Sequence, residues 1–164
     1  MSAHANPDIV TDGLVLCLDA ADSKSYPGSG TTWTNRVEQG NNGTLVNGPT
    51  FDSSNGGSLS FDGANQYFSL GSNVAVSPVG FTVMMAIDVN DSQSSSSWNY
   101  WFMQVANDGH KYEFGKYGAG GNSFLFKDNF NTSQSSKSVS LSPGFSILHF
   151  CLLYTSDAAD DPTC

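Results

Sequence analysis

Charged side chains are scarce in this sequence, and basic ones are the scarcest. Only 13% of the 164 residues are charged, and six Lys and Arg stand against fifteen Asp and Glu. The basic residues form no cluster, and a chain with a formal net charge of −9 repels the phosphate backbone of nucleic acids. We therefore expect no nucleic-acid partner.

Long apolar runs and cysteines are also few. No apolar run approaches the ~18 residues of a membrane-spanning helix, and residues 1–13 lack the basic and apolar regions of a signal peptide. The cysteines, Cys17, Cys151 and Cys164, are odd in number and widely spaced, which predicts neither a disulfide framework nor a zinc site. We expect no membrane span, and we expect Cys17 to pack as a small hydrophobe.

Gly, Ser, Asn and Thr replace the missing charges, and aromatic residues make up 12% of the chain. This composition is typical of short strands joined by polar turns rather than of helices. Roughly ten strands, spaced every ~8–12 residues, predict one antiparallel two-sheet sandwich. They cover 13–20, 43–51, 57–63, 66–71, 80–89, 98–106, 111–118, 122–128, 137–141 and 145–150.

Three local patterns make the prediction more specific. In Gly80–Val89 the apolar residues alternate, which places Phe81 and Val83 on one face and Thr82 on the other. Residues 62–65 predict the turn of a hairpin between 57–63 and 66–71, and residues 118–121 predict a second hairpin turn. Gly43 is expected to supply a positive φ at a turn.

The N-terminal third resembles a known family. The runs "GLVLCLDA", "SYPGSGTTW", "GNNGTLVNGPTF" and "GGSLSFDG" followed by Tyr67 are similar to the laminin-G-like, concanavalin A-like jelly-roll domains of phage and other virion structural proteins. The resemblance covers residues 13–71. It implies an all-β, antiparallel two-sheet jelly-roll sandwich of the concanavalin A-like type, truncated at its C-terminus.

Two positions depart from the pattern of that family. Asn35 stands where such domains commonly have Asp after Trp-x, and Gln66 replaces the Asp of the usual Asn-Asp-Tyr. A role for those two acids, including calcium ligation, does not carry over to this chain.

The sequence of the C-terminal residues differs in character from the rest of the chain. Cys151–Asp160 matches the codons TGT CTC TTA TAC ACA TCT GAC GCT GCC GAC in order, and so resembles the translated end of a transposase-type sequencing adaptor. The alternative is a natural strand followed by an acidic tail. We expect an N-terminal arm at 1–12, a partial jelly roll at 13–150 and a non-native tail at 151–164, with the family's closing strands missing.

Catalytic patterns are absent from the sequence. Retaining glycoside hydrolases need two carboxyl groups about 5–5.5 Å apart, which on one strand means acids at i and i+2. Glu38 and Glu113 are isolated, no Glu-x-Asp-x-Glu run occurs, and no Gly-x-Ser-x-Gly elbow supports nucleophilic catalysis. We expect a protein that is not an enzyme.

Two kinds of binding site remain possible. Relatives often place Ca²⁺ at a sandwich rim on Asp and Asn oxygens, and the candidate ligands here are Asp19, Asp62 and Asn65; the alternative is plain turn chemistry. The 98–106 strand is aromatic on both faces, with Trp98, Tyr100 and Phe102 predicted on one of them. Since only one face can be core, Trp98 and Tyr100 are candidates for binding a glycan.

The function expected from these features is a non-catalytic recognition or decoration module of a phage virion protein. Its partner would be a glycan or another virion protein, and its location the virion or the extracellular space. The alternative is a secreted glycan-binding protein or glycoside hydrolase of the same fold.

Overall fold

A computed structural model gives the fold of the chain. It describes residues 12–37, 41–70, 74, 80–89, 99–105, 111–116, 123–130, 133–140 and 144–153. The chain divides into two compact units, Met1–Ala75 and Val76–Cys164, which we call unit 1 and unit 2. The domain boundaries predicted after residues 12 and 150 stay a prediction, and strand β11 (Gly144–Leu153) runs across the second of them.

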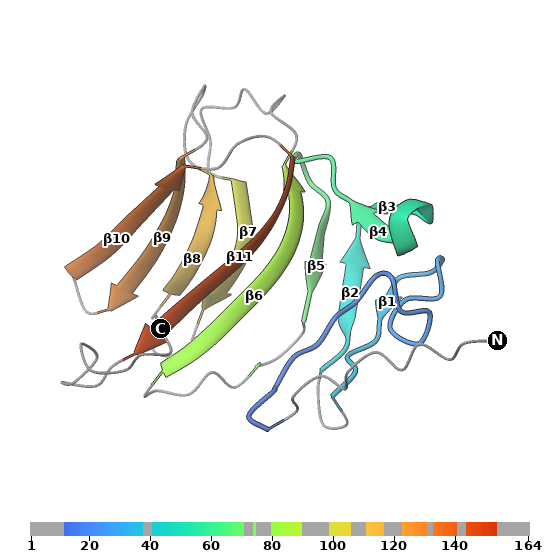
Figure 1. The fold of residues 1–164 in the computed structure, drawn as a ribbon, viewed down its shortest axis with the longest axis horizontal. Coiled ribbons are helices and arrows are strands. Elements are labelled where there is room, and N and C mark those ends of the chain that lie inside the picture. Colours follow the sequence, from blue (N-terminus) through green and yellow to red (C-terminus); the bar gives the residue numbers. More distant parts are fainter. Residues whose placement is uncertain are drawn as a thin grey trace. The chain divides into compact units, whose positions relative to one another are not determined.

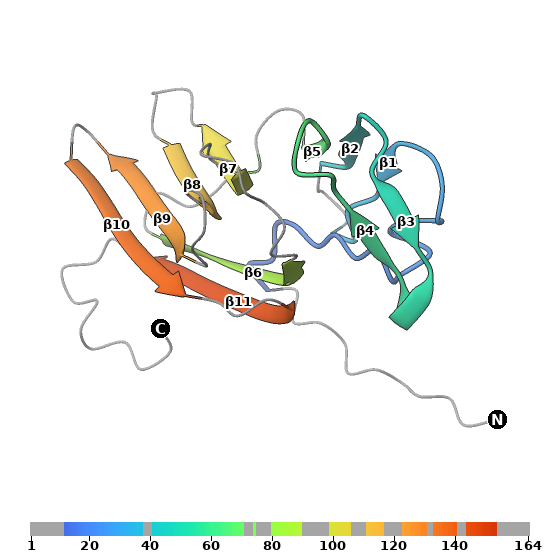
Figure 2. The same cartoon turned by 90° about the horizontal axis from the view of Figure 1, so that it is seen from above.

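Unit 1 is built from short strands. Strands β1 (Thr32–Trp33), β2 (Gly43–Val46) and β5 (Tyr67–Ser69) form a three-stranded antiparallel sheet in the order β1-β2-β5 (Figure 1). Strands β3 (Thr50–Asp52) and β4 (Ser58–Ser60) form a separate hairpin, joined by the 3-10 turn η1 (Ser54–Gly56) (Figure 2). The sequence did not predict this helical turn.

The inner face of the three-stranded sheet is aromatic. Trp33 lies opposite Gly43 in the β1–β2 register, and Leu45 lies opposite Phe68 in the β2–β5 register. The Trp33 and Phe68 rings meet edge to face with centroids 5.4 Å apart. Leu45 is buried beside them, so this face supplies the core of unit 1.

Position 43 is therefore occupied by glycine for a different reason from the predicted one. It is not among the described glycines with positive φ. A Cβ at this position would lie 3.3 Å from the Trp33 Cβ and 3.6 Å from Leu18 Cδ1. The close approach of the Trp33 Cβ and of Leu18, rather than a turn, therefore favours glycine at this position.

A second aromatic contact fixes the hairpin. The Tyr26 and Phe51 rings lie 5.4 Å apart, and the Tyr26 hydroxyl donates to the Gly30 carbonyl over 3.0 Å. The Phe51 ring also lies 3.2 Å from where a Cβ on Gly28 would stand, and Gly28 has φ 87°. Tyr26, 4% exposed, is the second large buried side chain among the described residues.

Unit 2 is built from long strands. Strands β7 (Asn99–Val105), β8 (Lys111–Lys116), β9 (Ser123–Phe130) and β10 (Ser133–Ser140) form an antiparallel meander in the order β10-β9-β8-β7. Strands β6 (Gly80–Val89) and β11 pair antiparallel over ten residues each (Figure 1). The predicted β8–β9 hairpin is confirmed, while its turn at 118–121 lies outside the described residues.

Strand β6 also shows the predicted alternation. Phe81, Val83, Met85 and Ile87 are half-buried, whereas Thr82, Met84, Ala86 and Asp88 are exposed. On β11 the residues opposite the exposed set include Phe145 and Ile147, which are 69% and 65% exposed. The exposed face of the β6–β11 pair therefore carries large apolar side chains beside polar ones such as Thr82 and Asp88.

Three predicted elements in unit 1 are wrong. Residues 13–20 form no strand, because side chains rather than a strand ladder satisfy part of their backbone. The predicted strand 43–51 is broken into β2 and β3 at Asn47-Gly48, where both residues have positive φ (60° and 67°). Residues 62–65 do turn, but β4 pairs with β3 and β5 with β2, so they join two sheets rather than closing a hairpin.

The described residues are strand-rich, and every strand pair among them is antiparallel, so the chain belongs to the all-β class.

One feature of the cysteines was missed by the sequence analysis: Cys151 is disulfide-bonded and Cys17 is free. No helix among the described residues is long and apolar enough to cross a membrane.

Candidate functional site

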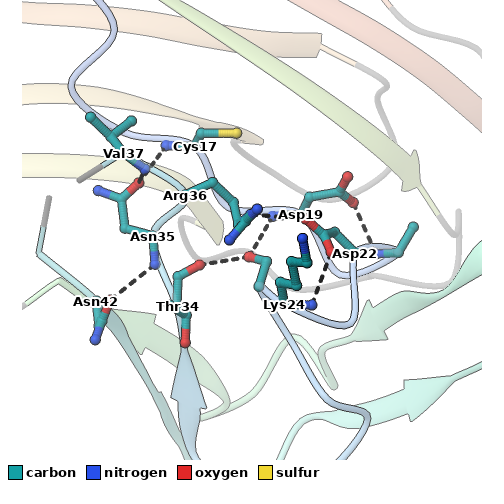
Figure 3. Close-up of polar contacts among 11 residues, drawn as sticks. Cys17, Asp19, Asp22, Lys24, Thr34, Asn35, Arg36, Val37 and Asn42 are labelled. Carbon is teal, nitrogen blue, oxygen red and sulfur yellow. Dashed lines mark hydrogen bonds and ion pairs between the residues drawn. The ribbon is translucent and has the colours of Figure 1, made fainter. Parts of the chain in front are cut away.

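Asn35 is the polar centre of the N-terminal part of unit 1 (Figure 3). Its side chain is 7% exposed, and its Oδ1 accepts hydrogen bonds from the backbone N–H of Cys17 at 2.9 Å and of Val37 at 3.1 Å. Its Nδ2 donates to the Val15 carbonyl at 3.3 Å, and its own N–H donates to Asn42 Oδ1 at 3.0 Å. One amide thus joins segments about twenty residues apart in the sequence.

Ser25 also joins separate backbone segments through hydrogen bonds. It is fully buried, and its Oγ donates to the Thr34 carbonyl at 2.7 Å and accepts from the Asp19 N–H at 3.1 Å. The Ser25 N–H donates to the Asp22 carbonyl at 2.8 Å. Asp22 also forms an ion pair with Arg36, with Nε and Oδ2 2.9 Å apart, which is partly exposed and therefore worth little.

This network explains the departure from the family pattern at residue 35. A carboxylate at this position could accept the bonds from Cys17 and Val37, but it could not donate to the Val15 carbonyl. Asn satisfies both kinds of partner, so in this chain the position has a structural role that needs an amide.

Cys17 lies inside the same network and is not set up as a nucleophile. Burial, and next the nearby Asp19 carboxylate, raise the pKa of the Cys17 thiol above its ordinary value. A raised pKa keeps the thiol protonated near neutral pH, and the thiolate is the reactive form. The expectation that Cys17 packs as a small hydrophobe agrees with its half-buried position.

The turn at residues 62–66 is organised by one carboxylate. Asp62 Oδ1 accepts from the N–H groups of Ala64 at 2.9 Å, Asn65 at 3.2 Å and Gln66 at 3.2 Å, while Gln66 Oε1 accepts from the Asp62 N–H. The bond from Ala64 above all holds the pKa of Asp62 below its usual value, against a weaker opposing effect of desolvation. Asp62 therefore caps the turn as an anion.

The 62–66 turn is also tied to the Asn47-Gly48 turn. Asn47 Nδ2 donates to the Asn65 carbonyl at 2.6 Å, and Gln66 Nε2 donates to the Gly48 carbonyl at 3.1 Å. Two loops that are 18 residues apart in the sequence are therefore hydrogen-bonded to each other, and together they form a rim at this end of the sheet.

The three predicted calcium ligands all take part in turn chemistry. Asp19 Oδ1 accepts from the Ala21 N–H at 2.9 Å, Asp62 Oδ1 accepts three backbone bonds, and the Asn65 carbonyl accepts from Asn47. Within the described part of the chain, no three His, Cys, Asp or Glu residues gather as a metal site would require. Calcium binding stays a prediction, which the turn contacts do not favour.

Only some of the glutamates and histidines of the chain lie among the described residues. Glu38, His4 and His110 lie outside the described residues, and Glu113 lies opposite Lys127 in the β8–β9 register. His149 is exposed on β11. The expectation that the chain is not an enzyme stays a prediction.

The predicted glycan residues cannot be placed as side chains. Trp98 lies outside the described residues, and for Tyr100 only the backbone of β7 is described. The β7–β8 register shifts between Tyr100 and Phe102, which marks a bulge and interrupts the simple alternation used to predict their shared face. Their role in binding stays a prediction.

A different aromatic residue stands on a surface suited to binding. Tyr67 is 52% exposed and lies opposite Val46 on the outer face of the β1-β2-β5 sheet. The same face carries Thr32, Thr44 and Ser69, which lie in register across the three strands and are all exposed. We call Thr32, Thr44, Val46, Tyr67 and Ser69 the outer face of unit 1.

Hydrogen-bonding capacity remains unused on this outer face. Among the described residues, neither the Tyr67 phenol nor the Thr32 and Thr44 hydroxyls makes a hydrogen bond. The rim formed by Asn47 and Gln66 borders Tyr67 in sequence and register. Sequence reasoning missed this site because alternation in a three-residue strand does not show which face is core. The register of β2 with β5, which shows it, comes from the structure.

The chain matches no protein-family model, no curated protein and no solved structure.

Proposed function

We propose that the chain is a non-catalytic recognition module whose ligand is a glycan. The observation that carries the proposal is the outer face of unit 1, where Tyr67 stands exposed beside a row of hydroxyl side chains. A sugar ring has an apolar C–H face, which packs on an aromatic ring, and an edge of hydroxyls, which need donors and acceptors. The outer face offers both kinds of contact side by side.

The hydrogen bonds of the rim support the same proposal. The turn bordering Tyr67 is held by Asp62, Asn47 and Gln66 through side-chain bonds, so little conformational entropy would be lost there on binding. The chain's net charge of −9 favours a neutral or cationic ligand over an anionic one, which fits a neutral glycan.

The wider setting of the proposal comes from the resemblance of residues 13–71. A jelly-roll module of a virion structural protein, located on the virion or outside the cell, would present such a surface to glycans or to another virion protein. The concanavalin A-like jelly roll, with its two facing sheets, is part of this proposal.

The test is a glycan array followed by titration of the strongest neutral hit, using the full chain. Tyr67→Ala should weaken binding about fivefold or more, because an aromatic contact contributes roughly 1 kcal/mol beyond the area it buries. Phe145→Ala is the control, since Phe145 is also an exposed aromatic residue but stands on β11 opposite Asp88, outside the outer face of unit 1, and binding should not change. Equal losses in both variants, or no neutral glycan bound at all, would refute the proposal.

Trp98→Ala separates the two candidate sites. Binding that survives Tyr67→Ala but is lost in Trp98→Ala would return the site to the 98–106 strand. Release of reducing sugar from β-glucans by the wild-type chain would favour the alternative, a glycoside hydrolase.

A further inference from the structure

The outer face of unit 1 consists of two rows of residues that run across the strands. Thr32, Thr44 and Ser69 lie opposite one another on β1, β2 and β5, and we call them the hydroxyl row. Val46 and Tyr67 lie opposite one another two residues away on β2 and β5, and we call them the apolar row. Each strand that contributes to the apolar row therefore contributes to the hydroxyl row as well.

The apolar row continues toward β1 as open surface. The residue two positions before Thr32 is Gly30, which is exposed and carries no side chain. A Cβ placed on Gly30 would meet no atom within 4 Å. A ligand that lies on Tyr67 and Val46 therefore meets no obstruction from Gly30 when it extends in the direction of β1.

The spacing of this face decides the direction in which a repeating ligand would lie. Strand β2 lies between β1 and β5 (Figure 1), and neighbouring strands are about 4.8 Å apart, so the hydroxyl row repeats at that interval. Residues on the same face of one strand are about 6.8 Å apart. The hydroxyl groups of the outer face therefore form their closer and more regular series across the strands, not along them.

An extended chain of β-1,4-linked sugars has the matching repeat. Each sugar of such a chain advances it by close to the spacing between neighbouring strands. The chain is a flat ribbon, with apolar ring faces and with hydroxyl groups along both edges at every sugar. An α-1,4-linked chain coils instead, so its successive hydroxyl groups leave a straight line.

We propose that the outer face of unit 1 binds a neutral, extended β-1,4-linked glycan whose chain crosses β5, β2 and β1 with one sugar on each strand. The first ring packs on Tyr67, the second lies on Val46, and the third lies over Gly30, with its hydroxyl edge at Thr32. This inference rests on the proposed function, because it narrows the ligand of the same surface from a glycan to one class of glycan.

The charge of the face selects a neutral chain. None of the five residues of the outer face is charged. A glycan with carboxylate or sulfate groups would find no Lys or Arg among these residues, and the net charge of −9 would repel it.

The first test compares chain length and linkage, using the full chain and titration followed by NMR. The probes are the β-1,4-linked trisaccharides of glucose, N-acetylglucosamine and mannose, each with its own monosaccharide and with an α-linked trisaccharide of the same sugar. The best β-1,4-linked trisaccharide should bind about tenfold or more tightly than its monosaccharide, because two further rings add hydrogen bonds. It should also bind more tightly than the α-linked form.

The second test removes the hydroxyl group farthest from Tyr67. Thr32→Val keeps a branched side chain of similar size, and it should weaken binding of the trisaccharide about threefold or more while leaving the monosaccharide unaffected. Tyr67→Ala should weaken binding of both. Thr50→Val is the matched control, since Thr50 is an exposed strand threonine in the separate β3–β4 hairpin, and it should change neither.

The outcomes separate this inference from the proposed function. If a neutral glycan binds and depends on Tyr67, but the trisaccharide binds no better than the monosaccharide, the function stands and the inference is wrong. The same holds if the α-linked form binds equally well, or if Thr32→Val and Thr50→Val have the same effect on trisaccharide binding. If no neutral glycan binds, the proposed function fails and this inference fails with it.

Discussion

Units 1 and 2 are both made of antiparallel strands, yet different bonds hold them. In unit 1 the strands are two to four residues long, and side chains such as Asn35, Ser25 and Asp62 make the connections between segments. In unit 2 the strands are six to ten residues long, and continuous backbone ladders connect them, eight residues in register for β9–β10 and ten for β6–β11.

The difference matters because backbone ladders and side-chain bridges are affected differently by amino-acid substitutions. A ladder uses groups that every residue except proline carries, so most substitutions leave it intact. A side-chain bridge depends on one residue with donors and acceptors in fixed places, and its loss leaves several backbone groups unpaired at once. Unit 1 should therefore be sensitive at a few named positions, and unit 2 should be tolerant at most.

The largest expected effect is that of Asn35→Ala. It removes the partners of the Cys17 N–H, the Val37 N–H and the Val15 carbonyl in a setting where Asn35 itself is 7% exposed. We expect a loss of about 3 kcal/mol in the free energy of unfolding, measured by urea denaturation.

Asn35→Asp is the matched control for this prediction. It restores the acceptor for Cys17 and Val37 but places an acceptor near the Val15 carbonyl, so its loss should be smaller than that of the Ala variant. If Asn35→Ala has the same midpoint of urea unfolding as the wild type, the hydrogen bonds of the Asn35 side chain do not stabilise unit 1.

Gly57→Ala should have the second-largest effect. Gly57 has φ 125°, and a Cβ there would lie 2.9 Å from the Ala20 carbonyl oxygen, so both strain and a backbone clash oppose the substitution. We expect a loss of about 2 kcal/mol by thermal denaturation. Gly48→Ala, with φ 67° and open space around it, should cost only about 1 kcal/mol; equal costs would contradict the close approach of Gly57 to Ala20.

The smallest effect concerns pH and Asp62. Hydrogen bonds, first of all from the Ala64 N–H, lower the pKa of Asp62 in the folded chain. A lowered pKa adds stability that is present above the unfolded value of about 3.9 and is lost as pH falls through the folded value. Asp62→Asn keeps an acceptor oxygen but cannot titrate, so its melting temperature should change less than that of the wild type in the acid range. If the melting temperatures of the two proteins fall equally as the pH is lowered, the titration of Asp62 does not contribute to stability in the acid range.

The sequence predicted the strands of unit 2 better than those of unit 1. Alternation over ten residues identifies β6 and its half-buried face, since a ladder and a period of two are both local signals. Residues 13–20 have an apolar pattern as well, but whether they form a strand depends on Asn35, whose reach across 18–20 residues leaves no periodic trace. The pairing of β5 with β2 rather than β4 is equally non-local.

The candidate site was less predictable than the fold. Asp19, Asp62 and Asn65 were named for the chemistry of their oxygens, and the structure shows that Oδ1 of each Asp and the backbone carbonyl of Asn65 already accept hydrogen bonds. Tyr67 was part of a recognised motif, but its exposure follows from its register with Val46, which the sequence does not contain.

Residue-resolved amide exchange in wild type and Asn35→Ala tests most directly whether side-chain bridges hold unit 1 while ladders hold unit 2. Our account predicts that the variant loses protection at Cys17 and Val37 and elsewhere in unit 1, while the amides of the β6–β11 ladder keep theirs. Unchanged protection at Cys17, or an equal loss across both units, would contradict it.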